Sequence, residues 1–300
     1  MFGRLPWLFA LALAGGAVPA QAQEFPLAPL IARLPGGTRA LAMANADLGG
    51  RESDVMFYNP AQLAAARGTN ASAEFYTHGD LLAGFSTVIG TGAGRIGVGV
   101  QSLTFSSASP TYAAPGGLGA NEPLSSSGLV VAAGYAHSLF DVRLGANVKL
   151  LQQQIGAIRD TRGAVDAGLA YDVWGGTAGL SVQNVGPSLR TFSGTVSQPS
   201  RASLGFTSGR YEAGPLDFNA AAAASVLRGR SFVASAGGEL AYRWGHGYAV
   251  AAQVGVRRAA EGEGPWTAGA SLGSGRFALE YAYESRDGRP GGQRIGLAIR

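Results

Sequence analysis

The residues able to do chemistry are few and scattered in this chain of 300 residues. It contains no Cys, which excludes disulfides, zinc–thiolate sites, iron–sulfur clusters and cysteine nucleophiles. Its three His residues, His78, His137 and His246, lie far apart, so a histidine-rich metal site is not expected. His137 and Ser138 are adjacent, and adjacent side chains of a strand point to opposite faces, which argues against a Ser–His pair. We therefore expect a protein that is not an enzyme, with no catalytic residues, no cofactor and no metal ligand.

The charged side chains favour pairing with one another over chemistry on a substrate. They make up only 14% of the chain, against about 25% in a typical soluble domain. The net charge is +4, and the Arg residues are spread among nearly as many acids, so no nucleic-acid partner is expected. Many of these charges alternate with apolar residues, which predicts pairing between neighbouring strands around an enclosed lumen. The candidate lumen charges are Arg143, Lys149, Asp166, Glu239, Arg276 and Glu280.

The elements that carry these charges are predicted to be strands. From residue 68 onward, apolar and polar or small residues alternate with a period of two, the pattern of a strand with one apolar face. Most segments are about ten residues long, which is the length that a tilted strand needs to cross a bilayer. We count fourteen segments, beginning near Thr69, Leu81, Arg95, Ser126, Asp141, Ala164, Gly176, Arg201, Leu216, Ser231, Gly247, Trp266, Arg276 and Gln293.

The connections between the segments alternate in length, which favours an outer-membrane barrel. Those after the even-numbered strands are tight, such as residues 91–93, 138–140 and 273–275. Many after odd-numbered strands are longer, including residues 106–125, 155–163 and 184–200. Short turns at one end and long loops at the other are typical of a barrel whose tight turns lie in the periplasm.

A soluble antiparallel sandwich is the structural alternative, since alternation alone does not exclude it. The face opposite the apolar one would then meet water and should be rich in Lys and Glu. Here that face is mostly Gly, Ala, Ser and Thr, and the chain has a single Lys. We therefore predict an all-β fold, a closed antiparallel transmembrane β-barrel of about fourteen strands over residues 68–300, in contact with lipid and lipopolysaccharide.

The first residues are predicted to direct export. Arg4 precedes an apolar run over residues 5–18, and Ala20-Gln21-Ala22 has the small-x-small pattern of a cleavage site. Residues 1–22 are therefore predicted to be a signal peptide. Export and the absence of Cys suit a protein of the bacterial outer membrane better than a disulfide-stapled secreted domain.

Residues 23–67 do not alternate and are predicted to form a helical hatch inside the barrel. Residues 39–46 favour a short helix before Gly49-Gly50. Asn59 is a good N-cap, with Pro60 at the first helical position. A segment this short cannot form a core alone, and burial in the lumen would explain the small residues that face it.

The hatch motif, which we take as Asp54, Phe57, Asn59, Pro60 and Ala61, resembles a known family. Together with the run from Gly37 to Ala46, it is similar to the N-terminal signature of the PorV/PorQ outer-membrane proteins, which are related in fold to FadL-type transporters. Residues 179–187 and 294–300 resemble PorV/PorQ sequences as well. One departure is the final residue, Arg300, where such barrels usually end in an aromatic residue that assists assembly.

Two functions follow from this resemblance. PorV/PorQ similarity implies a component of protein secretion and cell-surface attachment that binds exported cargo or partner proteins through its long loops. FadL similarity implies instead a channel for hydrophobic small molecules. The sequence details favour the first interpretation narrowly, with the FadL-like channel as the alternative.

Overall fold

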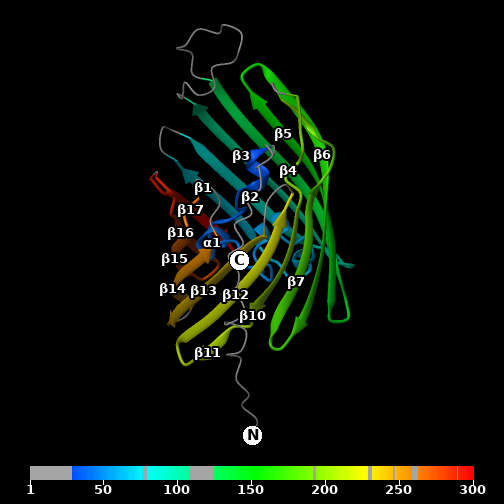
Figure 1. Cartoon of the computed structure of the whole chain (residues 1–300). Helices are drawn as coiled ribbons and strands as arrows, with labels where there is room; N and C mark the ends of the chain where they lie inside the picture. Colours follow the sequence, from blue (N-terminus) through cyan, green and yellow to red (C-terminus); the bar gives the residue numbers. More distant parts are fainter. Residues whose placement is uncertain are drawn as a thin grey trace.

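The computed structural model describes residues 29–76, 80–107, 124–191, 194–228, 232–245, 247–258, 263–288 and 290–300. It is a closed antiparallel barrel of fourteen strands with a short helical segment at its N-terminal side, which confirms the predicted fold class (Figure 1). The predicted signal peptide and most of the loop at 106–125 lie outside the described residues, as do His78 and His246.

The barrel strands begin within a few residues of the predicted positions, with one exception at the sixth strand. They are β1 (Thr69–Phe75), β2 (Leu81–Gly90), β3 (Arg95–Ser107), β4 (Leu124–Leu139), β5 (Val142–Ile155), β6 (Ile158–Val173), β7 (Gly176–Val185), β10 (Arg201–Ser208), β12 (Leu216–Leu227), β13 (Phe232–Trp244), β14 (Tyr248–Arg257), β15 (Trp266–Ser274), β16 (Phe277–Glu284) and β17 (Gly292–Ile299).

Each barrel strand pairs with the next, and the last returns to the first. Thr69 of β1 lies opposite Ile299 of β17, and Phe75 lies opposite Gln293. Pairing of β10 with β12 completes the ring. The short strand β11 (Tyr211–Ala213) only extends the edge of β12, and β8 (Leu189–Thr191) and β9 (Gly194–Val196) form a separate hairpin between β7 and β10. A closed ring leaves no long unpaired edge.

The two ends of the barrel differ, and we call them the turn end and the loop end. At the turn end, two-residue turns join β4 to β5, β6 to β7 and β15 to β16. At the loop end lie the longer connections, such as residues 186–200 and 285–291. This is the predicted alternation of short and long connections.

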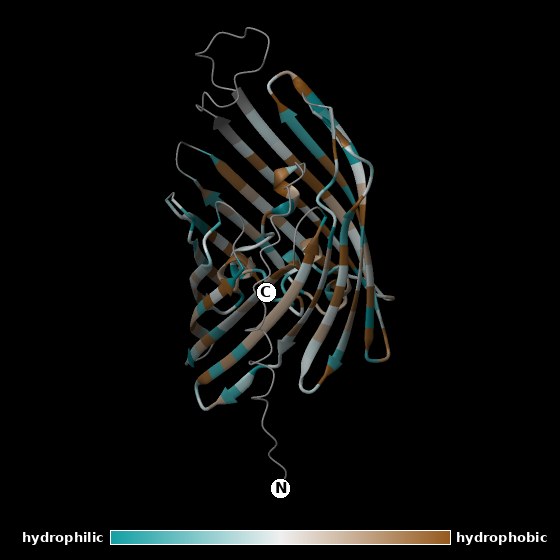
Figure 2. Ribbon diagram, in the orientation of Figure 1, coloured by the Kyte–Doolittle hydropathy of each residue, from teal (hydrophilic) through white to brown (hydrophobic). Residues whose placement is uncertain are grey.

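Apolar side chains cover the outside of the barrel. On β17, Ile295, Leu297 and Ile299 are exposed while the residues between them are buried, and β16 exposes Phe277 and Leu279 in the same way. Figure 2 shows the resulting alternation of brown with white or teal along the strands. Near the turn end, Trp244 stacks between Tyr242 and Tyr248 on this outer surface, as expected of an aromatic belt at a membrane interface.

The prediction of a long loop at residues 155–163 is wrong, because β6 continues through most of this range. Ile155 pairs with Ile158, and Gly156 turns the chain with a φ of 56°. Polar residues on both strands hold this extension, since the Arg159 guanidinium donates a hydrogen bond of 2.5 Å to the Gln152 side chain. The sixth strand therefore begins at Ile158 and not near Ala164.

The segment before β1 lies inside the barrel and consists of short helical turns, which we call the hatch (Figure 1). These are η1 (Leu30–Arg33), α1 (Thr38–Ala42), η2 (Ser53–Phe57) and η3 (Pro60–Ala64). The helix predicted over 39–46 ends early, because Ala44 and Asn45 adopt left-handed backbone angles and the Asn45 amide bonds back to the Ala40 carbonyl at 2.8 Å. None of the helices in the described ranges combines the length and hydropathy of a membrane span.

Candidate functional site

The hatch motif sits against a patch of glycines on three neighbouring strands. A Cβ built on Gly145 of β5 would lie 2.4 Å from the Pro60 carbonyl oxygen, and one on Gly168 of β6 would lie 2.2 Å from the Asn59 side chain. Gly179 of β7 approaches the Asn59 amide in the same way, at 2.8 Å. Any larger residue would displace the hatch, so these glycines set where the Asn-Pro-Ala turn docks.

Glycines on other strands of the barrel also lie in close contact with the hatch. Added Cβ atoms on Gly237 of β13 and Gly255 of β14 would collide with the backbone around Met43, and one on Gly296 of β17 would collide with Thr38. The small inward residues noted in the sequence therefore mark the close approach of the hatch.

Asn59 caps its helix and joins it to another part of the hatch and to β6. Its side-chain oxygen accepts a hydrogen bond of 3.2 Å from the Ala61 amide, which is the predicted N-cap with Pro60 at the first helical position. Its amide nitrogen donates to the Leu48 and Leu169 carbonyls at 3.4 and 3.3 Å. Phe57, another predicted motif residue, is buried, and its carbonyl accepts a hydrogen bond from Gln183 of β7.

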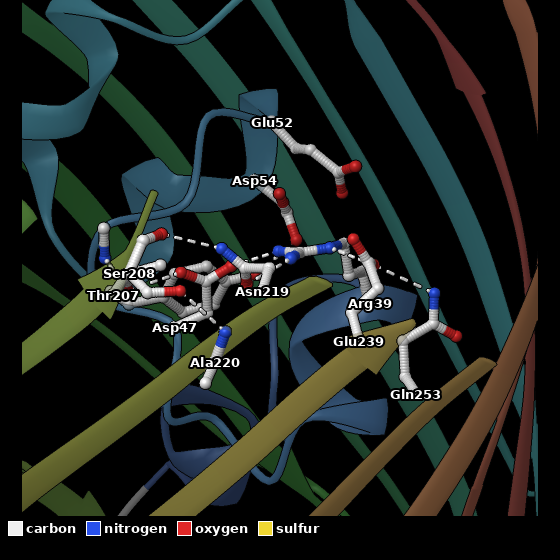
Figure 3. Close-up of polar contacts among 12 residues, drawn as sticks. Arg39, Asp47, Glu52, Asp54, Thr207, Ser208, Asn219, Ala220, Glu239 and Gln253 are labelled. Carbon is white, nitrogen blue, oxygen red and sulfur yellow. Dashed lines mark hydrogen bonds and ion pairs between the residues drawn. The ribbon is translucent and has the colours of Figure 1, made fainter. Parts of the chain in front are cut away.

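Arg39 of α1 joins the hatch to strands β12 and β13 of the barrel (Figure 3). Its Nε donates to the Glu239 carboxylate of β13 at 2.8 Å, and its other nitrogens contact Asp47 of the hatch and the Asn219 side chain of β12. Each carboxylate also accepts a hydrogen bond from the barrel, since Thr207 donates to Asp47 at 2.8 Å and Gln253 donates to Glu239 at 3.0 Å. We call this set of contacts the Arg39 latch.

Asp54, the acidic member of the predicted motif, is buried beside the latch. Burial raises the pKa of Asp54 to about 7, and the nearby charge of Glu52 acts in the same direction. The Tyr58 hydroxyl donates a hydrogen bond to Asp54 and partly opposes that rise. In Figure 3 the Asp54 carboxyl points toward Arg39 and Glu52 lies above it.

Five of the six candidate lumen charges lie on the inner face of the barrel. Arg143 pairs with Asp172 at 2.6 Å, and Lys149 pairs with Asp166 at 2.7 Å. Glu239 belongs to the Arg39 latch, and Glu280 is buried, with Arg300 at 3.7 Å as its ion-pair partner. These positions follow the predicted strand alternation.

Arg276, the sixth candidate, stands apart from the other five. It lies exposed in the turn between β15 and β16, one residue before the strand begins. The prediction started the strand one residue early, and a turn residue is not bound by the alternation of faces.

Sequence reasoning missed two contacts that fix the hatch. Arg39 stands in the run that carries the family resemblance, but nothing in its spacing identifies Glu239 as a partner 200 residues away. The buried Arg294–Glu74 pair joins β17 to β1, and Arg294 also donates to the Pro35 carbonyl at 2.8 Å. The register of the barrel closure, which places Glu74 opposite Arg294, was the signal that could have revealed this pair.

The interior divides into an apolar wall and a polar cavity. Toward the loop end, Leu82 lies opposite Leu103, and Val130 lies opposite Leu151, all four buried and facing inward. Ile31, Met56 and Phe57 of the hatch belong to the same buried cluster. We call this face of β2–β5 the apolar wall.

At the turn end, a cavity of about 1130 Å³ lies between the hatch and the turns. Its lining is rich in charge, from Arg39 and Asp47 of the hatch to Arg243 of β13. No group of three His, Asp or Glu residues suited to a metal ion occurs within the described ranges.

No protein-family model and no curated protein sequence matches the chain. Among solved structures it is similar to the Pseudomonas putida toluene transporter TodX, with 12% identity and a TM-score of 0.57 over 89% of this chain and 97% of that one. The Ralstonia pickettii toluene transporter TbuX matches at 13% identity and a TM-score of 0.56, covering 89% and 99% of the two chains. A Pseudomonas aeruginosa FadL homologue matches at 11% identity and a TM-score of 0.53, covering 92% and 98%.

These matches confirm a FadL-like fold, and none of them supports PorV/PorQ specifically. At such low identity they establish the architecture alone. This chain, a fourteen-stranded barrel with a hatch in its lumen, therefore shares the fold of these structures.

Proposed function

We propose that the protein is an outer-membrane channel for hydrophobic small molecules, with the hatch as its gate. The observation that carries this proposal is the apolar wall. Leu82, Leu103, Val130 and Leu151 form a continuous apolar surface inside the barrel, and the hatch covers it. The solved structures with this architecture include two described as toluene transporters.

The apolar wall suits a passage for molecules that water solvates poorly. Burial of an apolar ligand against such a surface contributes about 25 cal/mol per Å². The same side chains now bury Ile31, Met56 and Phe57, so a ligand can occupy the wall only where the hatch withdraws. Contacts such as the Arg39 latch would then control passage.

Entry of radiolabelled toluene into intact cells tests this function. We expect faster entry into cells that carry the protein than into cells without it. Leu103→Gln should reduce entry, because a polar group replaces part of the apolar wall. Leu227→Gln is the matched control, since Leu227 is equally buried at 3% exposure but lies outside that cluster.

Heat-modifiable gel migration would verify that both variants form closed barrels. Entry that is no faster with the protein than without it would refute the proposed function. Equal effects of the two substitutions would refute the role of the apolar wall.

The secretion interpretation stays a prediction that rests on sequence resemblance. It requires exported cargo or secretion partners to bind the long loops at 106–125 and 184–200, and the first of these lies largely outside the described residues. No contact among the described residues and no comparison favours it over the channel.

A further inference from the structure

The turn-end cavity is lined by one more arginine than carboxylates. Six arginines and five carboxylates line it. Each carboxylate already has an arginine within 4.0 Å: Arg39 for Asp47 and Glu239, Arg143 for Asp172, Arg210 and Arg243 for Asp217, and Arg300 for Glu52. The lining therefore has no unpaired acid left for the two remaining arginines.

Those two are Arg51 and Arg67 of the hatch. Among the described residues, neither side chain has a hydrogen bond or an ion pair, and both are exposed to the cavity. Arg51 is near enough to stabilise the negative charge of Asp172, but that carboxylate already accepts two hydrogen bonds from Arg143, at 2.6 and 2.7 Å.

The backbone holds the two arginines side by side. The Arg67 amide donates a hydrogen bond of 3.2 Å to the Arg51 carbonyl, and Glu52 forms a parallel bridge with Arg67. The two arginine side chains therefore extend from neighbouring backbone positions on the hatch. A guanidinium presents a planar fork of donors that matches an oxyanion such as a carboxylate, sulfate or phosphate.

We propose that Arg51 and Arg67 form an oxyanion-binding site on the hatch face of the turn-end cavity. This goes beyond the proposed channel function, because the ligand is charged and the site faces the turn end instead of the apolar wall. The surrounding charges are paired with one another, so the guanidinium groups of Arg51 and Arg67 keep their donors open to a ligand. The cavity volume of about 1130 Å³ also admits an oxyanion that carries an organic tail.

Titration calorimetry on the full mature protein in neutral detergent, at constant ionic strength, tests the site. Sulfate and butyl sulfate are the probes, since they share a head group and differ in the tail. Tighter binding of butyl sulfate would identify an amphiphile's head group as the ligand, and equal binding would identify a free anion. In either case we expect saturable binding of one anion per chain.

The double substitution Arg51→Gln/Arg67→Gln should weaken binding at least about tenfold, the effect of losing charged hydrogen bonds. The matched control is Arg228→Gln/Arg258→Gln, which removes the same charge from exposed residues at the loop end. Equal weakening in both double variants would show diffuse attraction and overturn the site, as would the absence of saturable binding.

Heat-modifiable migration of both variants would show that the barrel remains folded. Toluene entry separates this inference from the channel function. Entry that persists without anion binding refutes only the oxyanion site, and anion binding without toluene entry refutes only the channel.

Discussion

Removal of the Arg39 guanidinium is the sharpest perturbation of the hatch. In Arg39→Gln, the carboxylates of Asp47 and Glu239 lose their cationic partner inside the barrel. The three side chains are only 16%, 4% and 14% exposed, so water compensates little. Breaking a buried ion pair costs about 3–5 kcal/mol.

We expect the lower end of that range, because both carboxylates keep a second partner. Thr207 still donates to Asp47, and Gln253 still donates to Glu239. A loss of about 3 kcal/mol shifts the equilibrium between docked and undocked hatch by roughly a hundredfold.

Hydrogen exchange followed by mass spectrometry measures this shift directly. Amides of residues 38–50 should exchange up to about a hundredfold faster in Arg39→Gln, while amides of the barrel strands keep their protection. Adding Glu239→Gln should restore part of the protection, because it removes one of the stranded charges. Arg228→Gln, at the loop end, is the control.

Unchanged exchange in residues 38–50 would refute the latch. Equal acceleration in the strands would show that Arg39 supports the whole barrel and not the hatch alone. Purely additive effects of the two substitutions would show that Arg39 and Glu239 do not act as a pair.

Three further predictions concern the hatch. Gly145→Ala should destabilise docking by about 1–3 kcal/mol, because the added Cβ overlaps the Pro60 backbone; Gly163→Ala, with its nearest neighbour at 4.0 Å, should not, and equal thermal stability of the two variants in detergent would contradict this. Asp54 keeps its proton in the docked hatch between its ordinary pKa of 3.8 and about 7, so docking should weaken as pH rises through that window. Asp54→Asn should abolish this dependence in hydrogen exchange at pH 5 and pH 8, and a persisting dependence would assign it to another group. Asn59→Ala should cost about 0.5–2 kcal/mol as a lost N-cap and raise the frequency of conductance events in planar bilayers; an unchanged frequency would count against the cap.

The sequence was sufficient for the barrel because a strand between lipid and a filled lumen must alternate. Ile295, Leu297 and Ile299 show this directly, since each faces outward and each neighbour faces inward. The same rule assigned Arg276 to a strand, although it lies in the turn just before β16, and it missed the polar hairpin around Gly156, where the strands continue beyond the apolar belt.

The contacts of the hatch were largely out of reach of the sequence. Asn59 and Pro60 were recognisable because a helix cap is local. The Arg39–Glu239 and Glu74–Arg294 pairs depend on how a ring of fourteen strands closes, and no local pattern encodes partners 200 and 220 residues apart. The apolar wall also needs the register of four strands before its residues come together.

A cysteine lock tests most directly whether the hatch lies in the lumen and gates it. The chain has no Cys, so Ser53→Cys/Ser86→Cys introduces one thiol in the hatch and one in β2, where the native hydroxyl oxygens are 2.8 Å apart. Ser203→Cys/Ser225→Cys is the control, because these two serines lie opposite each other on the barrel strands β10 and β12, with their hydroxyl oxygens 2.9 Å apart.

We predict that both disulfides form under oxidation. The disulfide between the hatch and β2 should stop toluene entry until a reductant is added. The disulfide between β10 and β12 should leave entry unchanged. Failure of Ser53→Cys and Ser86→Cys to crosslink would contradict the docked hatch, and full toluene entry through the crosslinked protein would contradict its role as the gate.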